Sequence, residues 1–157
     1  MCEKIHRIIG IVGKQEKIQE HIHRIGVPID AFVLSADEPL EHRTVIEYLE
    51  KWSKEIGTAQ YGASTLMGML EFGGLEEKRE CNADELSDGE KQKLLLLKAL
   101  MSCNHYFIIW GLFRQLEKKN IEKITEMLIE FSTFSDIILA CDEDTGFEIC
   151  DKVIYCE

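Results

Sequence analysis

Five short runs of this chain are apolar almost throughout, and this feature constrains the fold more than any other. The runs are RIIGIVG (7–13), DAFVLSA (30–36), YFIIW (106–110), DIILAC (136–141) and KVIY (152–155). Strands that face water on one side alternate apolar and polar residues, whereas strands of a covered parallel sheet are apolar on both faces. Because segments with helical spacing separate most of the runs, the sequence predicts an α/β fold with a mostly parallel sheet covered by helices.

The intervening segments have apolar residues at helical spacing. Helices are predicted over 14–25, 44–57, 64–75 and 120–131, besides one that follows Leu86. Gly57 is the expected stop of the second helix, and Gly73 and Gly74 are expected to break the third. We predict one domain over 1–157, with a helical lobe over about 44–87 inserted in the α/β core.

The net charge indicates which classes of partner can bind this protein, and the cysteines indicate its compartment. A net charge of -11 repels nucleic acid and anionic lipid surfaces over long range, so neither is expected to bind. No apolar run reaches the length of about 18 residues needed to cross a bilayer, so any membrane link has to come through a partner. There is no CxxC pair and no charged-then-apolar leader, which favours a reduced, cytoplasmic protein. The cysteines are Cys2, Cys81, Cys103, Cys141, Cys150 and Cys156.

A short motif in the second half of the chain points to a phosphate-related function. LSDGE (86–90), followed by KQKLLLLKALMSCNHYFII (91–109), resembles the ATP-binding cassette (ABC) ATPase family. The signature of that family is usually LSGGQ or LSGGE, followed by a basic, Leu-rich helix and the magnesium-binding strand. The resemblance implies a P-loop NTPase-like fold. It also implies that Ser87, Asp88, Gly89 and Glu90 contact the γ-phosphate of ATP held by the opposite subunit, where the helix N-terminus favours an anion.

The same residues have a purely structural interpretation. Ser87 and Glu90 form the spacing of a capping box, in which each side chain accepts a hydrogen bond from the backbone N–H of the other residue. A serine cap contributes about 1 kcal/mol, which by itself could select these residues. Both interpretations of the motif remain open from the sequence.

The phosphate loop of the family is degenerate in this chain. Such a loop needs a second glycine followed by Lys-Ser/Thr, so that amides wrap the phosphates, the lysine reaches the β/γ oxygens and the hydroxyl holds Mg²⁺. Gly13 matches the first glycine, but the second glycine and the Lys-Ser/Thr pair are absent. Lys14 and Lys17 are therefore expected to be surface lysines of the following helix. Because the chain also starts at this strand, the resemblance implies a truncated as well as degenerate member.

The catalytic acids and the switch histidine of the family are also missing. The gap-free match through Ile109 puts Trp110 where an aspartate organises Mg²⁺ and Gly111 where a glutamate activates water. Tryptophan cannot bind a metal, and its apolar surface suits a filled, dry core at this place. Cys141 stands at the position of the histidine that senses the γ-phosphate, and a thiol is a poor substitute for that imidazole.

These observations predict a non-catalytic ABC ATPase-like subunit that pairs with an intact ABC ATPase or transporter component and offers its signature in trans. Pairing with a second copy is another arrangement. The alternative function is a regulatory or structural protein that uses the fold without nucleotide, and an active transporter ATPase is the least favoured. No cofactor is expected, with ATP and Mg²⁺ only where a partner contributes them. No metal site is expected, because His21 and His23 point apart on a helix and His6 does not complete them.

Overall fold

The computed structural model describes residues 7–56, 62–114 and 116–157 of the chain. Cys2, His6 and Gly57, which figure in the sequence-based predictions, lie outside these ranges. The contacts divide the chain into two compact units. The sheet unit comprises Met1–Asp37, Asn104–Gln115 and Leu128–Glu157, and the helical unit comprises Glu38–Cys103 and Leu116–Met127.

The sheet unit is built on five strands in the order β2-β3-β4-β1-β5. The strands are β1 (Ile8–Val12), β2 (Phe32–Ser35), β3 (Tyr106–Trp110), β4 (Asp136–Cys141) and β5 (Lys152–Tyr155). Every pairing is parallel, and the register places Ile11 beside Ala140 and Ile154. Each strand falls within one of the five apolar runs. The predicted α/β fold with a mostly parallel sheet is confirmed.

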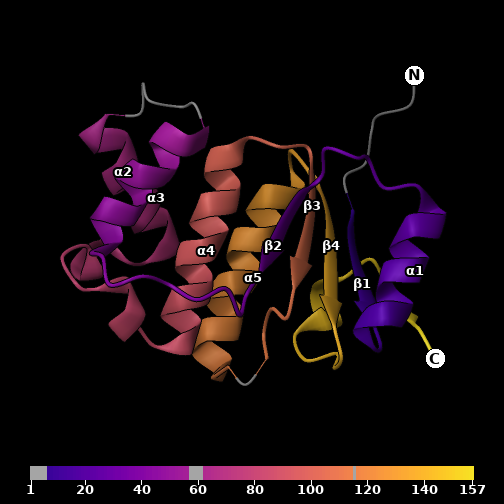
Figure 1. The fold of residues 1–157 in the computed structure, drawn as a ribbon. Coiled ribbons are helices and arrows are strands. Elements are labelled where there is room, and N and C mark those ends of the chain that lie inside the picture. The colour runs from indigo at the N-terminus through magenta and orange to yellow at the C-terminus, as the bar shows by residue number, and fades with distance from the viewer. Residues whose placement is uncertain (1–6, 57–61, 115) are drawn as a thin grey trace. The chain divides into compact units, whose positions relative to one another are not determined.

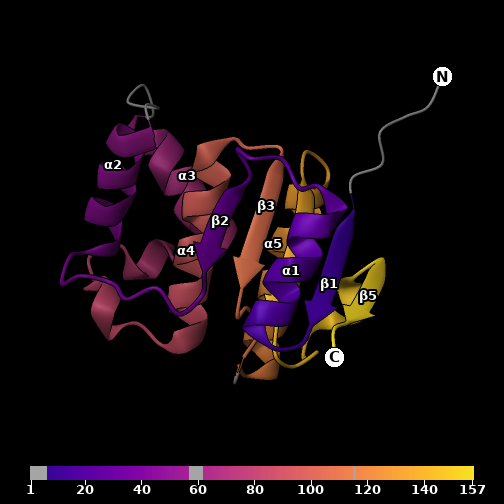
Figure 2. The same ribbon diagram turned by 45° about the vertical axis from the view of Figure 1, so that its right-hand side comes forward.

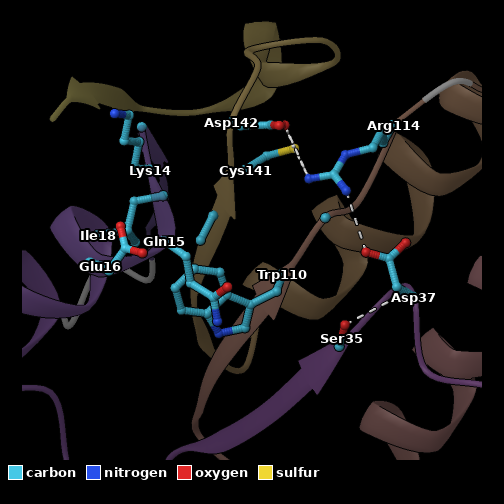
Figure 3. A pocket seen from close by; sticks show the side chains of 13 residues that line it. Lys14, Gln15, Glu16, Ile18, Ser35, Asp37, Trp110, Arg114, Cys141 and Asp142 are labelled. Atoms are coloured by element: carbon cyan, nitrogen blue, oxygen red, sulfur yellow. Dashed lines mark hydrogen bonds and ion pairs between the residues drawn. The ribbon is translucent and has the colours of Figure 1, made fainter. Parts of the chain in front are cut away.

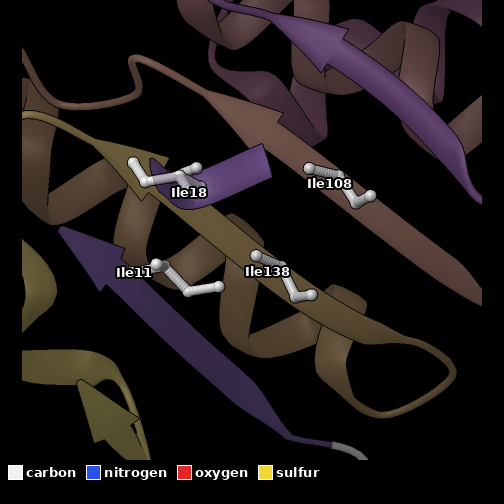
Figure 4. Close-up of a cluster of buried hydrophobic side chains, with 5 residues drawn as sticks. Ile11, Ile18, Ile108 and Ile138 are labelled. Carbon is white, nitrogen blue, oxygen red and sulfur yellow. The ribbon is translucent and has the colours of Figure 1, made fainter. Parts of the chain in front are cut away.

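Helix α1 (Gln15–Ile25) covers one face of this sheet (Figure 2). Its buried Ile18 packs among β-strand residues Ile11, Ile108, Ile138 and Ala140 (Figure 4). Burying one such isoleucine contributes about 1.5–3 kcal/mol, so this cluster fixes the helix on the sheet. The left-handed Gly26 (φ 73°) then ends the helix, in the conformation that glycine commonly adopts after a last helical turn.

The helical unit contains α2 (Val45–Ile56), α3 (Ala63–Gly73) and α4 (Asp88–Ser102), which pack against one another (Figure 1). Short 3₁₀ turns, η1 (Glu76–Lys78) and η2 (Ala83–Glu85), connect α3 to α4. Helix α3 ends at the predicted glycines, because the left-handed Gly74 donates its N–H back to the last turn. The buried ring of Trp52 packs on Tyr48 and lies under the ammonium group of Lys98.

Two further elements complete the described chain. Helix α5 (Lys118–Ser132) begins in the helical unit and ends in the sheet unit, where Phe131 packs against Phe107. A 3₁₀ turn, η3 (Phe147–Ile149), precedes β5. The single domain with a lobe over about 44–87 stays a prediction, and the helical unit has the wider bounds given above. Within the described ranges, none of the helices combines the length and the apolar character of a membrane span.

Candidate functional site

The sheet unit has an open cavity of about 500 Å³ at the carboxyl ends of strands β1 to β4 (Figure 3). In parallel sheets of this kind, ligands bind at this edge because the loops that follow the strands meet there. The cavity is lined by Gly13, Lys14, Gln15, Glu16, Ile18, Ser35, Asp37, Trp110, Gly111, Arg114, Ala140, Cys141 and Asp142. The structure therefore brings the predicted loop, metal, base and switch positions together around one space.

The loop after β1 contributes Gly13 and Lys14 to the cavity. Gly13 has a packing reason for being a glycine, because a Cβ atom there would lie 2.6 Å from the carbonyl oxygen of Cys156. Lys14 is exposed at the N-cap of α1 and makes no side-chain capping hydrogen bond. Lys17 does not line this cavity. It lies on a separate open groove of about 700 Å³ between α1 and the end of β5.

The expectation of a filled, dry core at the end of β3 is wrong. Trp110 is half-buried, with one part packed on the isoleucine cluster around Ile18 and another part lining the cavity. The indole therefore forms a wall of the space and does not fill it (Figure 3). The reason is geometric, since part of the side chain packs on the cluster that holds Ile18 of α1 and the rest of the indole stays at the surface of the cavity.

Gly111 occupies a left-handed backbone conformation that strongly favours glycine. Its φ is +75°, and an added Cβ would lie 3.2 Å from the Asp37 carboxylate. The buried Phe113, two residues on, also has a left-handed φ of 74°, which is rare for a bulky residue. The position that matches the family's glutamate therefore lies in a tightly turned loop after β3.

Arg114 is the charged centre of the cavity, and the sequence analysis missed it. Its Nη2 donates to Asp142 Oδ1 at 3.0 Å, and its Nη1 donates to Asp37 Oδ2 at 3.4 Å (Figure 3). Its Nη2 also lies 3.6 Å from the sulfur of Cys141. The Cys141 contact, followed by the charges of Asp142 and Asp37, raises the pKa of Arg114, so the guanidinium stays charged.

The signal that could have found this cluster was present in the sequence. Asp37 follows β2, Arg114 follows β3 and Asp142 follows β4, so each charge comes a few residues after a strand of the sheet. Carboxyl ends of neighbouring parallel strands meet at one edge. An arginine and two acids at these three places predict an ion cluster even without knowledge of the fold family.

Cys141, the residue at the switch position, is a buried thiol at the end of β4. Its sulfur contacts the guanidinium of Arg114 and lies 3.5 Å from Asp142 Oδ1. Cys81, Cys150 and Cys156 are also thiols outside any disulfide, and burial raises the pKa of Cys150 to about 12. Cys150 therefore lacks the lowered pKa that a nucleophilic cysteine needs.

The signature residues lie in the helical unit, at the N-terminus of α4. Both hydrogen bonds of the capping box are present, with Ser87 N donating to Glu90 Oε1 at 3.0 Å and Glu90 N donating to Ser87 Oγ at 3.2 Å. Partial burial acts to raise the pKa of Glu90, but these hydrogen bonds outweigh it and lower the pKa. Ser87 and Asp88 are exposed.

Gly89 is buried under the first turn of α5. A Cβ atom on Gly89 would lie 2.3 Å from Asn120 Nδ2 and 2.9 Å from Asn120 Cβ, so no larger residue fits without a shift. The glycine of the signature therefore has a local packing role. The exposed part of the motif consists of the hydroxyl of Ser87 and the carboxylate of Asp88.

Comparisons with known proteins give a clear result for the fold. No family model and no curated protein matches this chain. Among solved structures, the dimeric post-hydrolysis state of the ATP-binding cassette MJ0796 bound to ADP and Pi matches with a TM-score of 0.71, at 14% identity, over 100% of this chain and 84% of that chain.

Two further solved structures are similar. One is cbiO1 from Clostridium perfringens, part of the ABC transporter complex cbiONQ, with a TM-score of 0.71 and 16% identity over 100% of this chain and 76% of that chain. The other is an ATP binding subunit of an ABC transporter, with a TM-score of 0.69 and 17% identity over 96% and 75% of the two chains. At these identities the likeness establishes the fold, which is that of the ABC ATPases.

Proposed function

Because this chain has the fold of the ABC ATPases, we propose that it is a non-catalytic subunit that pairs with an intact ABC ATPase or transporter component. It holds no nucleotide of its own, and its signature residues face the nucleotide of the partner. ATP and Mg²⁺ belong to the partner's site. This role also places the chain in the cytoplasm, at the membrane only through its partner.

The ion cluster around Arg114 is the observation that carries the proposal. In an ATPase of this fold, the edge of the sheet presents a lysine and amides to the phosphates and carboxylates to Mg²⁺. Here two of the carboxylates that line the cavity, Asp37 and Asp142, are bound to a guanidinium of the same chain. The guanidinium of Arg114 thus neutralises the carboxylates that a metal ion would otherwise bind. Trp110 lines the wall of the same cavity.

The exposed end of α4 supports a role in trans. The hydroxyl of Ser87 and the first amides of a helix of 15 residues attract an anion such as a phosphate. The solved structure of MJ0796 is a dimer bound to ADP and Pi, so an ATPase with this fold pairs with a second copy. A subunit that keeps the signature and lacks its own metal ligands suits one half of such a pair.

A second candidate function is a regulatory or structural protein in which the signature is only a helix cap. Its specific support is local, since the capping box uses Ser87 and Glu90 fully and Asn120 covers Gly89. The carboxylate of Asp88, where the family has glycine, also disfavours a phosphate. The two candidates differ in what the Ser87 hydroxyl faces in a complex.

Substitutions at Ser87 separate these candidates. Ser87→Asp preserves the cap, because aspartate caps as well as serine, but it adds a negative charge where a partner's γ-phosphate would lie. Ser87→Ala should lose about 1 kcal/mol of stability under either candidate function. Thr145→Asp, at an exposed position in the sheet unit, is the control for added charge.

The experiment isolates the complex of this chain with an ABC ATPase from its own cells and measures ATP hydrolysis with each variant. We expect Ser87→Asp to fold normally and to abolish the partner's hydrolysis, while Thr145→Asp leaves it unchanged. Full hydrolysis with Ser87→Asp would show that the signature is only a cap. A chain that pairs solely with itself would contradict the pairing with an intact ATPase.

A further inference from the structure

Three side chains with metal-binding atoms converge in the helical unit, and neither the sequence analysis nor the proposed function uses them. His42 Nδ1 lies 3.2 Å from Asp84 Oδ1 and 3.1 Å from Asp84 Oδ2. Glu85 completes the group, with the ligand atoms of all three residues within 4.8 Å of one another. All three side chains are exposed, so an ion can reach them from solvent.

His42 and Asp84 form a hydrogen-bonded ion pair, and the separation of its two atoms is close to the spacing that a bound metal ion requires. Zn²⁺ binds histidine nitrogen and carboxylate oxygen at about 2.0–2.2 Å in a tetrahedral arrangement, which sets two ligand atoms about 3.3 Å apart. The separation between His42 Nδ1 and Asp84 Oδ2 is 3.1 Å, so an ion can bind both with little movement. Because all ligand atoms lie within 4.8 Å of one another, the Glu85 carboxylate has to move by at most about 1.5 Å to become the third ligand, and its side chain is exposed.

The backbone holds these ligands in place before any ion binds. The segment preceding α2 and the segment preceding α4 form an antiparallel bridge between Thr44 and Asn82, and Ala83 N donates to Arg43 O at 2.7 Å. The fully buried Val45 and Ala83 anchor the two segments. The residues next to His42 and Asp84 in the chain are thus fixed, so binding costs little ordering of the backbone.

The donor set selects the class of ion. A mixed site of one imidazole and two carboxylates suits Zn²⁺, Co²⁺ or Ni²⁺, whereas Ca²⁺ and Mg²⁺ prefer oxygen ligands alone. Two carboxylates balance the charge of a divalent cation, and a fourth position remains open for water. The group differs from an ordinary cluster of acidic side chains because the imidazole nitrogen of His42 lies close enough to the Asp84 carboxylate for one ion to bind both.

We propose that His42, Asp84 and Glu85 bind a divalent transition-metal ion, with Zn²⁺ as the preferred ion. The ion links the segment that precedes α2 to the 3₁₀ turn η2 that precedes α4. Because Glu85 lies two residues before the cap residue Ser87, the bound ion also holds the start of α4 in place. The proposal is independent of the function proposed for the fold.

The test titrates the full chain with Zn²⁺ by calorimetry under reducing conditions at about pH 7.5. We expect one ion per chain, and at least tenfold weaker binding for His42→Ala and for Asp84→Asn. His23→Ala and Glu143→Gln change an exposed histidine and an exposed carboxylate elsewhere and should leave the affinity unchanged.

A second readout locates the ion and separates it from the thiols. One equivalent of paramagnetic Co²⁺ should selectively broaden the amide signals of His42, Asp84 and Glu85 in a two-dimensional NMR spectrum. Absence of Zn²⁺ binding would overturn the proposal. Binding that survives in folded His42→Ala, or broadening confined to the surroundings of the cysteines, would overturn it as well.

Discussion

Arg114 and Asp142 form an ion pair at 3.0 Å between Nη2 and Oδ1, in the loops that follow two neighbouring strands. The side chains are 37% and 68% exposed, so water screens the pair. The interaction energy in a double-mutant cycle of Arg114→Met and Asp142→Asn should therefore be about 0.2–1 kcal/mol and should shrink in high salt. Urea unfolding of the four proteins measures this interaction energy.

The pair of Arg79 and Glu80, at 4.0 Å, is the control and should show no coupling. A coupling absent at low salt would mean that the ion cluster does not form.

The two tryptophans should differ in what their truncation costs. Trp52 is only 4% exposed, so Trp52→Ala should lose about 3–5 kcal/mol of stability. Trp110 is half-buried against the cavity, and Trp110→Ala should lose about 1.5–3 kcal/mol. Urea midpoints for the two variants decide the matter. If both variants lost the same free energy of unfolding, Trp110 would be a core residue, as the sequence alone suggested.

Two glycine-to-alanine changes should have opposite signs. Gly111→Ala places a side chain at φ +75° and close to Asp37, so it should destabilise by about 1–2 kcal/mol. Gly68→Ala lies in α3 with open space around the added methyl group, so it should stabilise by about 0.5–1 kcal/mol. Thermal unfolding of both variants tests this. If Gly111→Ala were neutral, the loop after β3 could accept the family's glutamate without strain.

The contact between Gly89 and Asn120 predicts a rescue. Gly89→Ala should destabilise by about 1–3 kcal/mol, because the added methyl group meets the Asn120 side chain. Asn120→Ala in the same chain should recover part of that loss, since it removes the two nearest atoms. The free energies of unfolding of the two single variants and of the double variant give the coupling energy between positions 89 and 120. Strict additivity would show that α5 does not cover the signature glycine.

Local sequence signals were enough for the elements of the fold. The apolar runs become the five strands, Gly74 ends α3 and the capping box of Ser87 begins α4, as their chemistry predicts. These features depend on residues within a few positions of each other.

The site was less predictable, because it depends on which distant residues meet. Whether Trp110 fills a core or lines a cavity depends on α1 and on the left-handed loop at Gly111, neither of which the run YFIIW encodes. The role of Arg114 depends on the convergence of three strand ends. The packing of Asn120 on Gly89 joins residues 31 positions apart in sequence (120 minus 89).

A calorimetric titration of the isolated chain with Mg-ATP tests the central claim most directly, with a thermal-shift assay beside it. The account predicts no saturable heat and no rise in Tm, because the phosphate loop lacks its lysine and hydroxyl, and because Asp37 and Asp142 of the cavity are bound to Arg114. A site that bound ATP would stabilise the fold by about 2.7 kcal/mol at a ligand concentration 100 times Kd. Saturable binding at micromolar ATP, with a Tm that rises by several degrees as the ligand increases, would contradict the account.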